Sequence, residues 1–183
     1  MTILHIDSSI NGDNSASRAI SRSIVERLTA HERDAEIITR DLVAEPLPHL
    51  TLASFNDQAV LEEFLAADTI VIGAPMYNFT LSTQLKAWID RLMIAGRTFR
   101  YTANGHEGLA GGRRVIIALA RGGIYDAGSP AAALEHLESY LRGVFNFIGI
   151  DPEFVAADGL NISPEQHETS IRVALGETIR LAA

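Results

Sequence analysis

The stretch Thr69-Ile70-Val71-Ile72-Gly73-Ala74 carries no charge, is rich in β-branched residues and is closed by Pro75. A short apolar run of this kind is typical of a strand that is buried on both faces, as strands of parallel sheets are. Four further segments are candidate strands, namely residues 3–6, 36–39, 114–120 and 153–156. The sequence therefore predicts five strands.

Segments with a helical spacing of apolar residues follow these strands. The clearest stripe repeats at i, i+3, i+4, i+7 and i+8 and consists of Leu85, Trp88, Ile89, Leu92 and Met93. This stripe is expected to belong to the core or to a dimer surface. The other expected helices cover residues 16–30, 56–66 and 134–148, and a last helix opens with Ser163 as N-cap and Pro164 at its first position.

Strands and helices therefore alternate, which predicts a parallel sheet with right-handed crossovers and helices on both faces. Residues 41–55, with Pro46 and Pro48, are interpreted as a connection, and residues 96–112 as a polar, Gly-rich stretch. Five strands in 183 residues fit an α/β fold of the flavodoxin-like, doubly wound class, with residues 1–183 as a single domain. In that class the ligand binds at the carboxyl ends of the strands.

Composition narrows the possible function. The chain has 15 Lys+Arg against 23 Asp+Glu, a net charge of −8, which argues against nucleic acid and anionic membrane surfaces as partners. The absence of cysteine excludes disulfides, thiolate nucleophiles and cysteine-bound metals, and the histidines show no metal-ligand spacing. The N-terminus lacks the basic region of a signal peptide, and no apolar run approaches the roughly 18 residues that would span a membrane, so a cytoplasmic protein is expected.

A hydroxyl-rich loop follows the first expected strand and leads directly into a helix: Ser8-Ser9-Ile10-Asn11-Gly12-Asp13-Asn14-Ser15-Ala16-Ser17-Arg18. A helix N-terminus offers free N–H groups and partial positive charge, so this loop is a candidate phosphate site, with Arg18 as an added charge. The alternative is that Ser15 or Ser17 simply caps the helix. The loop lacks the P-loop signature and G-x-G-x-x-G, which disfavours nucleoside triphosphates and the Rossmann dinucleotide site.

Two further loops follow the expected strands at 69–74 and 114–120. Pro75-Met76-Tyr77-Asn78-Phe79 combines aromatic rings with an amide that can donate and accept, which suits a flat ring with a polar edge. Arg121-Gly122-Gly123 lets the backbone approach a ligand closely. Each loop has an alternative reading, because Tyr77 and Phe79 can fill a loop core and glycines form ordinary turns. All three loops belong to one edge of the expected sheet, and together they favour a ligand site.

These segments, in this order, resemble the FMN-dependent NADH:quinone oxidoreductases known as azoreductases. The resemblance covers nearly the whole chain, and its most specific part runs from residue 74 to 102, including Ser82-Thr83-Gln84-Leu85-Lys86 and Thr98-Phe99-Arg100-Tyr101-Thr102. It implies a flavodoxin-like homodimer that holds FMN noncovalently near the subunit interface. It also implies NADH or NADPH as electron donor and quinones or azo compounds as acceptors.

The resemblance further implies roles for particular residues. The FMN phosphate would be held by Ser9, Ser15, Ser17 and the backbone around Ala16. The ribityl chain and isoalloxazine ring would contact Met76, Tyr77, Asn78 and Phe79. The pyrimidine side of the ring would be covered by Ala120, Arg121, Gly122 and Gly123. The substrate pocket would be lined by Asn78, Phe79 and Tyr101, the last from the partner subunit.

No side chain is assigned as a catalytic group, because the flavin carries the hydride transfer and one pocket serves donor and acceptor in turn. The chain departs from the family pattern at three places, one of which is His106, where proline is frequent and to which no role is assigned. The chain also runs compactly from residue 50 to 57, where several members have a polar insertion, and Ala120 stands where serine is frequent.

Two other function classes remain open: a flavodoxin-like FMN electron carrier that acts with protein partners, and a nonenzymatic regulator on the same scaffold.

Overall fold

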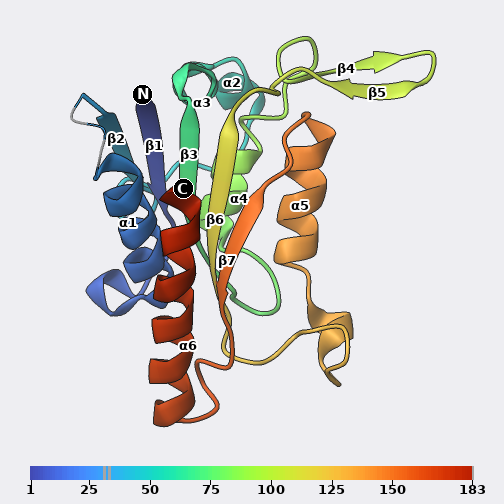
Figure 1. Ribbon diagram of the computed structural model, residues 1–183. Coiled ribbons are helices and arrows are strands. Elements are labelled where there is room, and N and C mark those ends of the chain that lie inside the picture. Colours follow the sequence, from blue (N-terminus) through green and yellow to red (C-terminus); the bar gives the residue numbers. More distant parts are fainter. Residues whose placement is uncertain (31, 33, 183) are drawn as a thin grey trace.

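The computed structural model describes residues 1–30, 32 and 34–182. Its central sheet has five parallel strands in the order β2-β1-β3-β6-β7, which confirms the expected flavodoxin-like α/β fold (Figure 1). The strands are β1 (Thr2–Asp7), β2 (Glu36–Asp41), β3 (Thr69–Pro75), β6 (Arg114–Ala120) and β7 (Glu153–Ala157). The stretch that decided the fold class is therefore the central strand.

Helices cover both faces of this sheet, as expected (Figure 1). One face carries α1 (Ala16–Thr29) and α6 (Pro164–Glu177), which continues into a 3-10 turn, η3 (Thr178–Ala182). The other face carries α3 (Ala59–Ala66), α4 (Thr83–Ile89) and α5 (Glu138–Phe147). None of the helices in the described part of the chain is long and apolar enough to cross a membrane.

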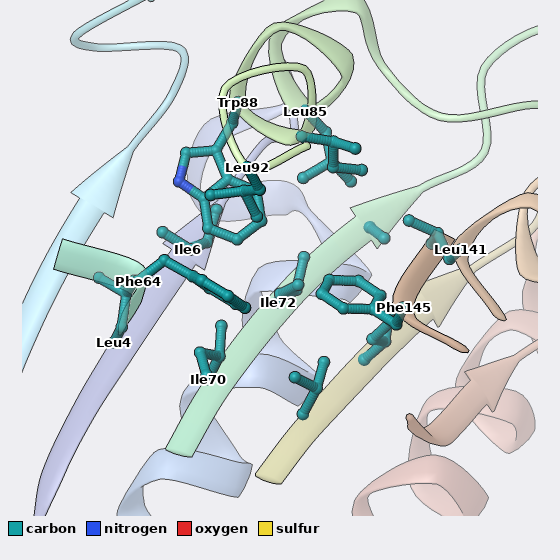
Figure 2. Packing of buried hydrophobic residues seen from close by; sticks show 14 of the residues in the cluster. Leu4, Ile6, Phe64, Ile70, Ile72, Leu85, Trp88, Leu92, Leu141 and Phe145 are labelled. Atoms are coloured by element: carbon teal, nitrogen blue, oxygen red, sulfur yellow. The ribbon is translucent and has the colours of Figure 1, made fainter. Parts of the chain in front are cut away.

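Successive side chains of β3 enter two separate hydrophobic cores, because alternate residues of a strand point to opposite faces. Val71 packs in the cluster beneath α1 and α6. Ile70 and Ile72 belong to the larger cluster, which includes Trp88 of α4 and Phe145 of α5 (Figure 2). All residues of β3 are buried, which explains why its sequence is apolar without alternation.

The apolar stripe expected to form a helix up to Met93 lies in the core, but α4 ends at Ile89. The hydroxyl of Thr98, which is fully buried, donates to the Leu92 carbonyl at 2.6 Å and accepts from the Ile94 N–H at 3.1 Å. The Leu92 carbonyl and the Ile94 N–H thus have hydrogen-bond partners without a further turn of helix. The chain therefore turns away while Leu92 stays buried.

A two-stranded antiparallel hairpin, β4 (Phe99–Thr102) and β5 (Gly105–Gly108), was not predicted within residues 96–112. It extends away from the end of the sheet at which the parallel strands begin (Figure 1). Its residues are mostly exposed, so they show no alternation between apolar and polar positions. The available signal was the pair Asn104-Gly105, with Gly105 at φ +117°.

Two helix boundaries also differ from expectation. Residues 41–55, interpreted as a connection, end in the short helix α2 (Leu52–Phe55). Thr51 and Ser54 cap this helix reciprocally, with Ser54 N–H donating to the Thr51 hydroxyl at 3.1 Å. The helix expected from residue 134 begins as a 3-10 turn, η2 (Ala132–Leu134), and α5 starts only after Glu135, whose carboxylate accepts three backbone N–H groups.

Candidate functional site

The register of the strands brings their carboxyl ends to one edge of the sheet. Asp7 pairs with Gly73, and Ala120 pairs with both Pro75 and Ala157. A cavity of about 200 Å³ opens at this edge and is lined by the loops after β1, β3, β6 and β7 and by His167 near the start of α6. The expected site residues that line it are Ser9, Ser15, Ala16, Met76, Tyr77, Ala120 and Gly122.

The loop after β1, which includes the short turn η1 (Gly12–Asn14), supplies hydroxyls at the N-terminus of α1. Ser15 is the N-cap and accepts the Arg18 N–H at 3.3 Å, which settles the choice of capping residue left open by the sequence. Ser15 also lines the cavity, so capping and a place at the site are compatible. Ser17 is fully buried behind it, with the two hydroxyl oxygens 3.0 Å apart.

Tyr77 connects two of the loops at the site. Its hydroxyl lies 3.2 Å from the Ser9 hydroxyl and accepts the Ile10 N–H at 3.1 Å. The Asn11 N–H in turn donates to the Ser9 hydroxyl at 3.3 Å. Tyr77 therefore does more than fill a loop core, because its phenol fixes the loop after β1 against the loop after β3.

A strained turn follows Tyr77. Asn78 and Phe79 have φ values of +47° and +74°, and the turn is closed by bonds in both directions between Tyr77 and Thr80. Two consecutive residues in this region are typical of a type I′ turn, which glycine and asparagine favour and phenylalanine disfavours. The Phe79 carbonyl accepts a hydrogen bond from the His136 N–H, at 3.0 Å, which fixes the turn to the segment before α5. Strain of this kind is concentrated at functional sites, where it directs particular side chains.

The Gly122-Gly123 loop lies directly against the loop after β7. The Gly122 carbonyl accepts the Asn161 N–H at 3.0 Å, and the Gly123 carbonyl accepts the Gly159 N–H at 2.9 Å. A Cβ on Gly122 would lie 2.5 Å from Nδ2 of Asn161, so a larger residue there would displace an amide that lines the cavity. The missing side chain at Gly122 therefore leaves room for the Asn161 amide beside the backbone, which an ordinary turn would not need.

Arg121 is turned away from the cavity. Its guanidinium is almost fully buried and donates two hydrogen bonds to Asp158, at 2.5 and 2.7 Å. Glu138 and Glu135 approach the same guanidinium at 3.3 and 3.8 Å. The side chain thus anchors the loop that carries the two glycines. The Arg121 backbone is engaged as well, because its N–H donates to the Ala157 carbonyl at 2.9 Å and its carbonyl accepts the Leu160 N–H at 3.2 Å.

Arg18 is likewise engaged inside the protein, and the expectation that it adds free charge to the loop is wrong. It donates to both carboxylate oxygens of Asp41, at 2.7 and 2.8 Å, and to the Ser9 carbonyl at 2.9 Å. Hydrogen bonding from Arg18 lowers the pKa of Asp41 to about 2. The pair therefore positions the loop after β1 and leaves its phosphate-binding capacity to hydroxyls and backbone N–H groups.

Replacing Asp41 by asparagine is expected to lower the free energy of unfolding by about 1 kcal/mol at neutral pH, since Arg18 loses its charged partner. The folded pKa of Asp41 is depressed, so the stabilisation is complete above the ordinary value of 3.8 and is lost as the pH falls towards 2. Urea unfolding of both proteins should show their difference shrinking over this range. A difference that stays constant would contradict the role of this ion pair.

Besides Ser17 and Arg121, four expected site residues lie outside the cavity lining. Asn78 and Phe79 occupy the strained turn beside it, and Gly123 is covered by the ring of Tyr125. Tyr101 lies on the hairpin at the other end of the sheet, 77% exposed (Figure 1). Within one chain the structure therefore gathers the three loops but leaves Tyr101 apart from them.

Three further residues of the cavity lining, Asn11, Asn14 and Pro75, belong to the candidate loops but were given no role of their own. Sequence reasoning missed the other three, Leu160, Asn161 and His167. Leu160 and Asn161 follow β7, whose carboxyl end lies at the same edge as the other strand ends. That topology was the signal, because a loop after any strand of such a sheet reaches this edge. His167 is one turn into α6 and carries no local sequence signal.

Comparisons with known proteins agree with this arrangement. A profile of the family described as Flavodoxin-like fold matches residues 1–180. The chain is 51% identical to FMN-dependent NADH:quinone oxidoreductase 2 of Bradyrhizobium diazoefficiens over 201 aligned positions that cover 100% of both proteins. It is also 51% identical to the FMN-dependent NADH:quinone oxidoreductase of Sinorhizobium fredii, again with 100% of both covered. The alignments are longer than this chain, so these relatives carry residues that it lacks.

Solved structures of azoreductases superpose closely on this chain. An azoreductase from Bacillus anthracis superposes with a TM-score of 0.90 at 26% identity, covering 100% of this chain and 98% of that one. An FMN-dependent NADH-azoreductase from the same species, solved in complex with FMN, gives a TM-score of 0.84 at 26% identity, with 100% of both chains covered.

A parallel sheet in this order, with a polar cavity at its carboxyl edge, defines a flavodoxin-like protein. Within that class the chain belongs to the family of FMN-dependent NADH:quinone oxidoreductases.

Proposed function

We propose that this chain oxidises NADH or NADPH and reduces quinones and azo compounds in two-electron steps, with noncovalently bound FMN. The observation that carries the proposal is the polar cavity at the carboxyl edge of the sheet. It lies in a chain that is 51% identical to the oxidoreductase of Bradyrhizobium diazoefficiens. The names of the relatives mention FMN, NADH and quinones, and those of structural neighbours mention azoreductase activity.

The chemistry of the cavity fits a phosphate at one end. Ser9 and Ser15 contribute hydroxyls, and Ala16 begins α1, whose first backbone N–H groups have no partner within the helix. Ser17 supports this end from behind through its contact with Ser15. We assign these four residues to the FMN phosphate.

The rest of the cofactor would extend over the other loops. Its ribityl chain and ring are assigned to Met76, Tyr77, Asn78 and Phe79, and the pyrimidine side of the ring to the segment Ala120, Arg121, Gly122 and Gly123. Bound FMN would supply the hydride chemistry. The part of the protein is to hold the ring, exclude water and offer hydrogen-bond donors at its polar edge. The rigid turn at Asn78 and Phe79 suits that part, because it fixes an amide and an aromatic ring beside the cavity.

A second copy of the chain would complete the site. Ligand pockets commonly measure roughly 300–1,000 Å³, and this cavity has about 200 Å³. The ring would therefore extend beyond this cavity towards Phe79, which is 43% exposed. We propose a homodimer in which the partner covers the ring and its Tyr101 joins Asn78 and Phe79 in the substrate pocket. In this proposal residues 1–183 form one FMN-binding domain that acts in the cytoplasm.

A steady-state assay with the purified chain tests the proposed activity. The chain with FMN is expected to oxidise NADH or NADPH when a quinone or an azo dye is the only acceptor present, without any added protein. The comparison of the two nicotinamides gives the donor preference. An electron carrier that acts with protein partners would leave the nicotinamide unoxidised under these conditions. A chain that takes up no FMN and stays folded would contradict the proposal and favour a regulator.

A further inference from the structure

Among the described residues, no arginine or lysine lines this cavity, although such side chains commonly bind phosphate. Arg18 is paired with Asp41, and Arg121 is paired with Asp158, Glu138 and Glu135, so neither guanidinium is free for an anion in the cavity. The protein as a whole carries a net charge of −8. Among the described residues that line the cavity, one side chain can take a positive charge, and that is His167.

The hydrogen bonding of His167 determines which ring nitrogen is free. Its Nδ1 lies 3.0 Å from the Leu160 carbonyl oxygen. A carbonyl oxygen can only accept, so Nδ1 carries a hydrogen and donates it. In the neutral ring Nε2 therefore has no proton and can only accept. Protonation at Nε2 turns it into a charged donor while the bond to Leu160 is kept.

We propose that His167 holds the phosphate of FMN and that binding of the dianion draws a proton from solvent onto Nε2. This inference rests on the proposed function, because it presumes that the cavity takes the FMN phosphate. A charge-assisted bond from an imidazolium would add to the neutral donors at Ser9 and Ser15. His167 begins the second turn of α6, with its N–H bonded to the Ser163 carbonyl, so the ring is carried on a regular helix.

Two other titratable side chains share the surroundings of His167. Tyr77 lines the same cavity, and Glu168 lines an adjoining cavity of about 480 Å³ together with His167. Neither is a cation, so neither can replace the imidazolium towards a phosphate.

The test compares FMN with riboflavin, which has the same ring and side chain but no phosphate. Calorimetric titration of the apo-protein at pH 8, in two buffers of different ionisation enthalpy, gives both affinity and proton uptake. At this pH free FMN is already a dianion, since the second pKa of a phosphate ester is about 6. Wild-type protein is expected to take up protons on binding FMN and to take up none on binding riboflavin.

The substitution His167→Gln is expected to abolish the proton uptake and to weaken FMN binding about tenfold, with the affinity for riboflavin changed less than twofold. His167→Lys carries a permanent charge and is expected to restore FMN affinity without proton uptake. His49→Gln is the matched control, because His49 is exposed and does not line the cavity. This control is expected to behave as wild type with both ligands.

Equal losses of affinity for FMN and riboflavin in His167→Gln would overturn the inference, because they would indicate a structural role only. Wild-type protein that binds FMN without taking up a proton would also overturn it, and this result needs no variant. Wild-type protein that binds neither flavin would instead overturn the proposed function itself, so the two failures are distinguishable.

Discussion

Replacing Ser17 by aspartate is expected to weaken FMN binding by a hundredfold or more. Ser17 is fully buried, and its hydroxyl lies 3.0 Å from that of Ser15, the residue that caps α1 and lines the cavity. A carboxylate at this place would stand beside a phosphate dianion with little intervening water. Two like charges about 4 Å apart repel by roughly 4 kcal/mol at an effective dielectric constant near 20, which corresponds to about a thousandfold in affinity.

The matched control is Ser17→Asn, which has nearly the shape of aspartate and no charge. It is expected to cost about 1 kcal/mol of binding free energy, the usual net value of a neutral hydrogen bond. Titration of each apo-variant with FMN at pH 8 measures the difference, and the thermal unfolding midpoint reports whether each variant is folded. If both folded variants bound FMN equally well, the phosphate would have to lie elsewhere.

Gly108→Ala is expected to have the largest effect on stability. Gly108 ends β5, and a Cβ built on it would fall on the backbone of Ile148 and Gly149 at the end of α5. Gly149 is itself at φ +90°, and the Ala110 N–H donates to the Ile148 carbonyl at 2.9 Å, so this contact is between two fixed backbones. Inserting a methyl group there is expected to cost about 3 kcal/mol or more, at the upper end of values for overpacking.

Urea unfolding of the wild type and the variant measures this cost. The same change at Gly143 is the control, because Gly143 lies within α5 with open space around its Cα. Gly143→Ala is expected to raise the free energy of unfolding by about 0.5–1 kcal/mol, since alanine favours a helix more than glycine does. A Gly108→Ala protein that unfolds at the same urea concentration as the wild type would show that the hairpin is not held against α5.

The fold could be predicted because β3 and β6, apart from the first residue of each, are buried runs of apolar residues without alternation. The hairpin could not, because its strands are mostly exposed and only the Asn104-Gly105 pair marks its turn. The end of α4 depends on a bond between Leu92 and Thr98, and no periodicity of the intervening residues reveals such a bond.

The candidate site was partly predictable for the same physical reason. Loops after parallel strands meet at one edge, so Ser9, Tyr77 and Gly122 could be brought together by topology alone. The partners of side chains could not be foreseen. Arg18 and Arg121 have the composition of anion-binding residues, but each is paired with carboxylates that come from distant parts of the chain.

Anaerobic reduction of the bound cofactor tests the central claim most directly. The protein reconstituted with FMN is mixed with one equivalent of NADH, and the flavin absorbance is followed until it is constant. A quinone is then added without oxygen. The account predicts that NADH bleaches the bound flavin and that the quinone restores its absorbance in full. Bound flavin that keeps its oxidised spectrum in the presence of excess NADH and of excess NADPH would contradict the account.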